Sequence, residues 1–193
     1  MKRLITALVV VVAVFSTGTT SGKEPGVHYE HLKPNAMMIG TWRYEGPLLE
    51  DVPGFAENGT EYVIQVTWRW ILNRNAVEIQ WTNQFHGGKK VMGKGLIGWN
   101  AAEEKITYGG MDSLGSMSIG TITFDDDGKT STLTSKGVDA EGETTEFKAS
   151  FKQVDKETLT WKALHRSGDL LEGESPVYTF KKVKRQGRKK AAK

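Results

Sequence analysis

The sequence predicts an all-β protein, an up-and-down antiparallel β-barrel of about ten strands. Two observations predict this fold class. Apolar and polar residues alternate with a period of two in one segment after another, and short turns rich in Asn, Asp and Gly separate the segments. An open sheet of this size would expose an apolar face and two unpaired edges, so we expect the sheet to close. A β-sandwich is the alternative fold.

Residues 1–22 have the layout of a secretory signal peptide. Lys2 and Arg3 precede an apolar run of twelve residues, Leu4 to Phe15, and a small, polar stretch follows. Twelve residues are too few to cross ~30 Å of hydrocarbon as a helix, so an uncleaved anchor is the weaker alternative. We therefore expect a secreted or periplasmic protein with no transmembrane segment after cleavage. The chain contains no Cys, which excludes disulfides and thiolate metal sites.

Residues 23–38 are predicted to be a linker and a short helix, and residues 39–183 the barrel. The stretch HYEHLKPNAMM (residues 28–38) is expected to form a helical plug across one end of the barrel. In the first strand, Gly40, Trp42 and Tyr44 alternate with polar residues. The longest irregular connection follows, over residues 46–60, and is interpreted as a lid over the other end.

The clearest hairpin covers residues 61–82. Between Glu61 and Leu72 every second residue is apolar, and a period of two gathers these side chains on one face. The turn Asn73-Arg74-Asn75 is tolerant of left-handed backbone. A second strand then carries Val77, Ile79 and Trp81 at alternate positions. The hairpin therefore presents one aromatic face.

Further strands are expected along the rest of the chain. They are predicted at residues 96–99, 105–111, 117–124, 131–136, 147–151, 159–163 and 177–183.

The charge distribution divides the chain into an acidic body and a basic tail. Residues 23–180 hold 16 Lys or Arg and 23 Asp or Glu, whereas residues 181–193 hold eight Lys or Arg and no acid. Residues 184–193 are predicted to be disordered. We expect residues 181–193 to contact an anionic envelope surface, and no specific nucleic acid. A solubilising tail, or one that contacts the acidic body, is the alternative.

Two motifs resemble lipocalin-like, or calycin, β-barrels. IGTWRYEG (residues 39–46) is similar to their opening Gly-x-Trp strand, and LIGWNAAEEKITYGGMDSLGSMSIG (residues 96–120) is similar to the central hairpin of an uncharacterised family of secreted bacterial lipocalin-like barrels. The resemblance covers about residues 32–183 and implies the fold, without an activity.

The opening motif also resembles nitrobindin, a ten-stranded haem-binding barrel. That family's haem ligand is a His on the closing strand. The closing strand here reads PVYTFKK (residues 176–182) and has no His. We therefore expect no haem and no other cofactor.

Aromatic residues on the predicted inner face are the first candidates for ligand binding. Such side chains either fill a barrel or line a pocket for an apolar or planar ligand. The candidates are Tyr44, Tyr62, Trp68, Trp70, Trp81 and Trp161.

Asp112 and His165 are the polar candidates. His165 continues the face of Leu159, Trp161 and Ala163, where an imidazole could contact a ligand or act as a general base. Asp112 and the following Ser fit a plain turn better than a nucleophile motif, since Gly-x-Ser-x-Gly is absent. No two His share a strand face at metal-binding spacing, so we expect no metal site.

Together these features favour non-catalytic binding of a small apolar ligand in an aromatic-lined lumen. One alternative is a structural or interaction module of the envelope, with a filled barrel and a basic anchoring tail. The other is a cyclase- or isomerase-like enzyme that uses His165 as a general base.

Overall fold

The computed structural model describes residues 24–167 and 175–184, which form a closed antiparallel barrel of ten strands. Each strand pairs with its neighbours in sequence, and β1 pairs with β10 to close the sheet. The predicted fold class is therefore confirmed. The predicted signal peptide and residues 185–193 of the predicted tail lie outside the described residues. The strands are β1 (Gly40–Pro47), β2 (Glu61–Ile71), β3 (Ala76–Phe85), β4 (Lys90–Asn100), β5 (Lys105–Asp112), β6 (Met117–Phe124), β7 (Thr130–Val138), β8 (Thr144–Asp155), β9 (Thr158–Arg166) and β10 (Val177–Lys182).

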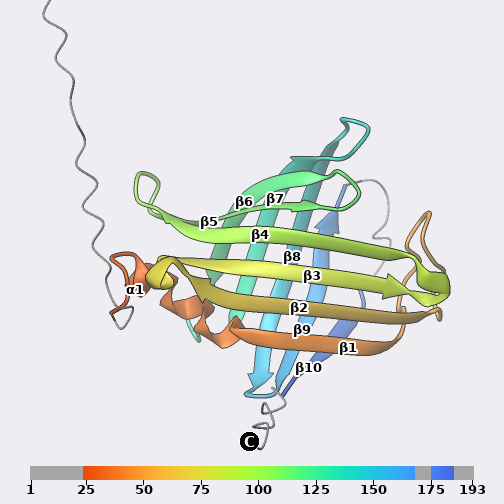
Figure 1. The fold of residues 1–193 in the computed structure, drawn as a ribbon, viewed down its shortest axis with the longest axis horizontal. Coiled ribbons are helices and arrows are strands. Elements are labelled where there is room, and N and C mark those ends of the chain that lie inside the picture. The colour runs from red at the N-terminus through yellow and green to blue at the C-terminus, as the bar shows by residue number, and fades with distance from the viewer. Residues whose placement is uncertain (1–23, 168–174, 185–193) are drawn as a thin grey trace, which may run out of the picture.

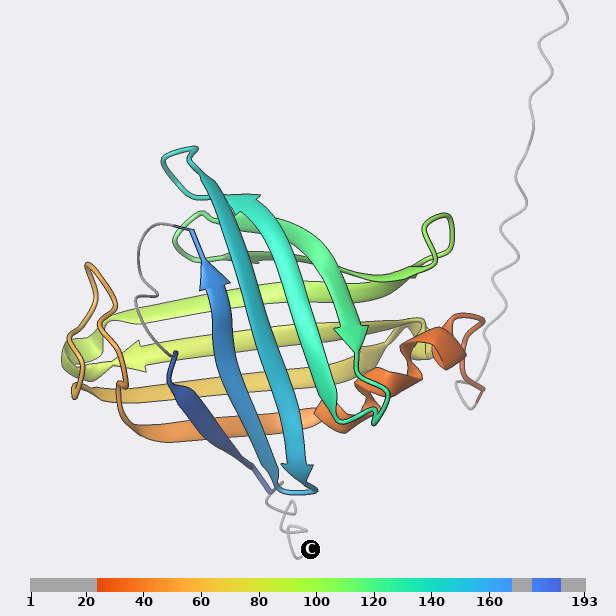
Figure 2. The same ribbon diagram turned by 180° about the vertical axis from the view of Figure 1, so that it is seen from behind.

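The barrel wall is strongly twisted. Strands β1–β5 run across one side of the molecule, and β7–β9 cross behind them at a steep angle (Figure 1). Figure 2 shows the same crossing from the other side, with the short β10 beside β9. This arrangement follows from the right-handed twist of paired strands, which accumulates until the sheet meets its own edge.

The two ends of the barrel are closed differently. At one end, here called the plugged end, lie helix α1 (Tyr29–Leu32) and the 3₁₀-helix η1 (Lys33–Met38). At the other end, here called the mouth, lies the loop of residues 48–60, which we call the lid (Figure 1). The predicted helical plug is confirmed.

Apolar packing holds the plug in place. Leu32, Met38 and Trp42 are at most 4% exposed, and the Trp42 indole Nε1 donates a hydrogen bond of 2.7 Å to the Met38 carbonyl. The His31 ring stacks on Trp99 of β4 with centroids 4.0 Å apart. These contacts fix the plug against both β1 and β4.

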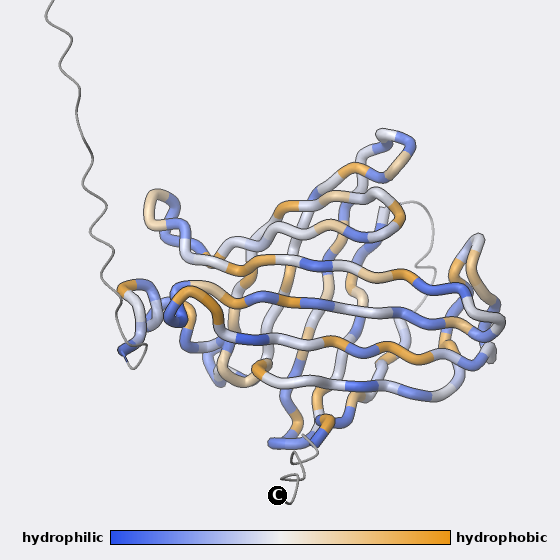
Figure 3. Tube along the Cα trace, viewed as in Figure 1, coloured by the Kyte–Doolittle hydropathy of each residue, from blue (hydrophilic) through white to orange (hydrophobic). Residues whose placement is uncertain are grey.

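Alternating hydropathy along the strands agrees with the pairing register. Hydrophobic and hydrophilic residues alternate along much of β2 and β3 (Figure 3). The register pairs Val66 with Trp81 and Trp68 with Ile79, so the predicted inner faces of these two strands meet. Leu72 differs from the prediction: it begins the 3₁₀-turn η2 (Leu72–Arg74) with a φ of 49° and is 72% exposed. The turn ends the alternation one residue early.

A helix with the length and apolar character needed to cross a bilayer is absent from residues 24–167 and 175–184.

Candidate functional site in the barrel lumen

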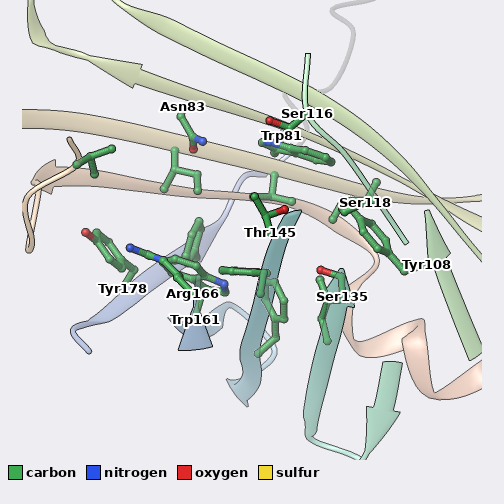
Figure 4. Close-up of a pocket in the computed structure, with 18 of the residues that line it drawn as sticks. Trp81, Asn83, Tyr108, Ser116, Ser118, Ser135, Thr145, Trp161, Arg166 and Tyr178 are labelled. Atoms are coloured by element: carbon green, nitrogen blue, oxygen red, sulfur yellow. The ribbon is translucent and has the colours of Figure 1, made fainter. Parts of the chain in front are cut away.

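The lumen contains a cavity of about 600 Å³. This volume lies within the range of ~300–1,000 Å³ that is typical of small-molecule sites. Side chains from the lid, the plug and the strands line it, and Figure 4 shows part of this lining. The larger apolar members include Trp68, Trp81, Ile97, Phe151, Trp161 and Phe180.

The cavity exists because one part of the wall is built from small residues. Gly93 and Gly95 on β4 lie opposite Trp81 and Ile79 of β3, and a Cβ atom at Gly93 would overlap the Trp81 ring. Gly110 on β5 accommodates the Tyr108 ring in the same way. The rings therefore lie over the glycines, against the wall, an arrangement known from other β-sheets.

Strand β7 continues the small-residue wall with serines. Ser131 and Ser135 are 3% and 4% exposed and line the cavity together with Ser118 of β6. Bulky residues at these positions would fill the lumen, as in a solid barrel. The space opposite the aromatic side chains is consequently left open.

An ion pair lies at the mouth end of the cavity. Arg166 Nη2 of β9 is 2.8 Å from Glu50 Oε1 of the lid, and the two side chains are only 22% and 16% exposed. The Arg166 guanidinium also lies 5.7 Å from the centroid of the Trp161 ring. A largely buried charge is costly unless it is paired, so each member of the pair depends on the other.

Two tyrosines and an amide extend this polar region. The Tyr62 hydroxyl donates to Asn83 Oδ1 over 2.9 Å, and the Tyr178 hydroxyl accepts a bond of 3.1 Å from the Leu49 amide. Burial raises the pKa of Tyr62 far above its usual range; nearby Tyr178 adds to the rise and Arg166 partly offsets it. Burial also raises the pKa of Tyr178. Both phenols are therefore neutral hydrogen-bonding groups at ordinary pH.

The structure brings four of the predicted aromatic residues to the cavity: Tyr62, Trp68, Trp81 and Trp161. Tyr44 shares their face but packs edge-on against Tyr178, 5.1 Å between centroids, and its hydroxyl donates to the Pro47 carbonyl at the rim.

Two further candidates lie away from the cavity lining. Trp70 lies at the plugged end, in an edge contact of 5.4 Å with Tyr29. Asp112 Oδ1 accepts bonds from the amides of Leu114 and Ser116, so its carboxylate caps the β5–β6 turn.

His165 does not continue the inner face, and this expectation was wrong. Lys148 pairs with His165 whereas Ala149 pairs with Ala163, so β9 contains one extra residue, Leu164, opposite β8. Such a β-bulge reverses the faces of the residues that follow it. The His165 side chain is therefore 56% exposed, 4.0 Å from Glu146, and Arg166 takes the inward position instead.

The sequence reasoning accordingly missed Arg166, together with its lid partner Glu50. It also missed the small-residue wall, for which a signal was present: Gly93 and Gly95 stand at alternate positions in VMGKGLIGW (residues 91–99). A period-two glycine pattern opposite an aromatic strand indicates rings that lie flat on the sheet. Among residues 24–167 and 175–184, no group of three or more His, Asp or Glu side chains is placed to hold a metal ion.

Comparisons with solved structures place this barrel among known folds. Rv2717c from M. tuberculosis is similar over 80% of this chain and 98% of its own, with a TM-score of 0.57 and 12% identity, a likeness that concerns the fold alone. A de novo designed fluorescence-activating β-barrel matches 60% of this chain and 92% of its own at a TM-score of 0.39 and 20% identity. A redesigned β-barrel matches 78% of this chain and 96% of its own at a TM-score of 0.42 and 9% identity.

No curated protein matches the sequence. A family does: residues 28–173 match the one described as "Protein of unknown function (DUF1579)". That match covers most of the chain, and the protein belongs to the DUF1579 family.

Proposed function

We propose that this protein binds a small, largely apolar molecule in its lumen without converting it, and that it does so outside the cytoplasm. The supporting observation is the cavity of about 600 Å³ between an aromatic wall and a wall of glycines and serines. A ligand that buries ~250 Å² of apolar surface there would gain roughly 6 kcal/mol from desolvation, before the cost of immobilisation. Taken alone, a gain of that size corresponds to a Kd of roughly 40 μM, which the cost of immobilisation weakens.

The cavity favours this function over a purely structural module with a filled barrel. The inert interior expected for such a module would place large side chains at Ser131 and Ser135, and these positions carry the smallest polar side chain instead. The position of His165 on the outer surface leaves the enzyme hypothesis without its general base.

A matched pair of substitutions tests the binding function. In Ser135→Phe the new ring enters the cavity, whereas in Thr134→Phe, on the same strand, the ring faces solvent. Nile red, a neutral apolar dye, is titrated into each full-length protein. We expect saturable emission with the wild type and Thr134→Phe, and at least tenfold weaker binding by Ser135→Phe. Circular dichroism checks the fold, since overpacking costs ~1–3 kcal/mol.

Equal affinity of the dye for Ser135→Phe and the wild type would contradict binding in the lumen. The same conclusion would follow if neither Nile red nor dodecanol altered the tryptophan emission of the wild type.

A further inference from the structure

We propose that the ligand of this cavity is an amphiphile with a carboxylate head, and that this head replaces Glu50 as the partner of Arg166 and so releases the lid. The proposal rests on the binding function proposed above and adds the chemical class of the ligand. Three observations carry it: the hydrogen-bonding capacity of Arg166, the polar groups beside it, and the origin of its present partner.

Arg166 offers more donors than its protein partners use. A guanidinium has five N–H groups in a planar fork that suits a carboxylate bidentately. Within the described part of the chain the Arg166 guanidinium makes one hydrogen bond, from Nη2 to Glu50 Oε1. The Trp161 ring covers it from one side, which restricts access from water. A two-oxygen acceptor in place of Glu50 would also use the donors that Glu50 leaves available.

The neighbouring polar groups also supply donors. The Asn83 oxygen is occupied by the Tyr62 hydroxyl, which leaves the Asn83 NH₂ group for another acceptor. The Tyr178 oxygen accepts from the Leu49 amide, which leaves the Tyr178 O–H as a donor. Asn83, Arg166 and Tyr178 lie at the same end of the cavity (Figure 4). Such a group of donors favours an anionic acceptor over a cation or an alcohol.

The present partner of Arg166 comes from the lid. Glu50 follows Leu49, whose amide binds Tyr178, so both contacts fasten the start of the lid to β9 and β10. The next carboxylate, Asp51, accepts a hydrogen bond of 2.7 Å from the backbone N–H of Asn58, within the lid. An unpaired Arg166 would be strongly unfavourable in this largely buried position. A ligand carboxylate can therefore replace Glu50 because it keeps Arg166 paired. Glu50 then returns to water, and the lid loses its ionic contact.

The remainder of the cavity suits an apolar chain. From Arg166 the lining continues toward Trp68, Ile97 and Phe180, nearer the plug. Seven residue steps separate Arg166 from Leu159 along β9, which is ~23 Å at ~3.3 Å per residue. A flexible acyl chain attached to the carboxylate fits this direction and depth.

Three ligands with the same tail and different heads test the proposal on the full-length wild type. Dodecanoate, dodecanol and dodecylamine each compete with Nile red at pH 7. We expect dodecanoate to bind at least tenfold more tightly than either of the others. Equal binding of dodecanoate and dodecanol would overturn the carboxylate assignment while leaving lumen binding intact, and a preference for dodecylamine would also overturn it. Failure of all three to compete would reject lumen binding itself.

Substitutions then assign the preference to the ion pair. Arg166→Met should abolish the preference for dodecanoate over dodecanol, and Glu50→Gln, which removes the competing charge, should increase it about tenfold. The control is the exposed pair Arg43–Glu45 on β1, also 2.8 Å long, where Arg43→Met and Glu45→Gln should leave the preference unchanged. A preference that survives in Arg166→Met would overturn the proposal.

Hydrogen exchange tests the release of the lid. Amides of residues 48–60 should exchange faster in the wild type saturated with dodecanoate than in the wild type saturated with dodecanol. Equal exchange in the two complexes would overturn the coupling between the head group and the lid.

Discussion

The plugged end and the mouth of this barrel are closed by different kinds of interaction. At the plugged end, Leu32, Met38 and Trp42 are almost completely buried. At the mouth, the lid is held by the Glu50–Arg166 ion pair, by the Leu49–Tyr178 hydrogen bond and by bonds from Lys89, alongside packing of Phe55 on Phe85. One end is thus sealed by apolar burial, whereas the other combines these polar contacts with the buried Leu48, which is 1% exposed, and the packing of Phe55.

This difference indicates which end can open. Apolar burial is lost outright when the surfaces separate, because water offers no equivalent partner. A polar contact can be exchanged for water or a ligand, so its net contribution is only ~0.5–1.5 kcal/mol. The plugged end therefore contributes to the stability of the fold, and the mouth is suited to the passage of a ligand. Three substitutions can test this comparison.

The largest effect is expected at the plugged end. Trp42→Ala removes a fully buried indole and its bond to the Met38 carbonyl, and we expect the free energy of unfolding to fall by ~3–5 kcal/mol. Urea denaturation followed by circular dichroism measures it. The control is Arg43→Ala on the same strand, whose exposed ion pair is worth at most ~1 kcal/mol. A loss below ~1 kcal/mol in Trp42→Ala would show that the plug does not support the fold.

An intermediate effect on the free energy of unfolding is expected from the buried tyrosine hydroxyls at the mouth. The pKa of Tyr62 is raised in the folded protein from an ordinary value of 10.0. Above about pH 10 the unfolded chain loses this proton and the folded protein retains it, so the free energy of unfolding should fall as pH rises, by up to about 1.4 kcal/mol per pH unit for each such tyrosine.

Tyr62→Phe should flatten this dependence between pH 10 and 12, measured by urea denaturation across that interval. Tyr29→Phe, at the plugged end, is the matched substitution for comparison. An unchanged slope in Tyr62→Phe would mean that this phenol ionises as readily in the folded protein as in the unfolded chain.

The smallest effect is expected at the lid. Lys89 Nζ donates to the carbonyls of Gly54 and Phe55 over 3.0 and 3.3 Å. Lys89→Met should speed hydrogen exchange of residues 50–59 several-fold and change the free energy of unfolding by less than ~1 kcal/mol, because the lid opens locally. Lys90→Met is the adjacent control. Global destabilisation equal to that of Trp42→Ala would remove the distinction between the two ends.

Much of the fold could be predicted because the period of two is a local property. The β2–β3 hairpin was predicted from Glu61 onward, with Trp68 and Trp81 on the inner face, and the structure agrees. The strand boundaries were less accurate. β4 begins at Lys90 rather than at Leu96, because its early glycines weaken the apolar alternation that marks a strand.

The candidate site was predicted only in part. Aromatic residues could be assigned to the lumen from alternation alone, and four of them line the cavity. The residues of the ion pair could not be found in this way. Glu50 lies in an irregular loop without periodicity, and Arg166 follows a bulge that the sequence of β9 does not mark.

The sequence by itself determined that hairpins with one apolar face follow one another and close, because alternation depends only on neighbouring residues and every exposed apolar face must be buried. The tertiary structure decided that Arg166 rather than His165 enters the lumen, since the extra residue at Leu164 exists only relative to the pairing with β8. It also decided that the barrel is open inside. The cavity remains because the large side chains of β2, β3 and β9 do not fill the space that the small residues of β4 and β7 leave empty. No single strand specifies this outcome.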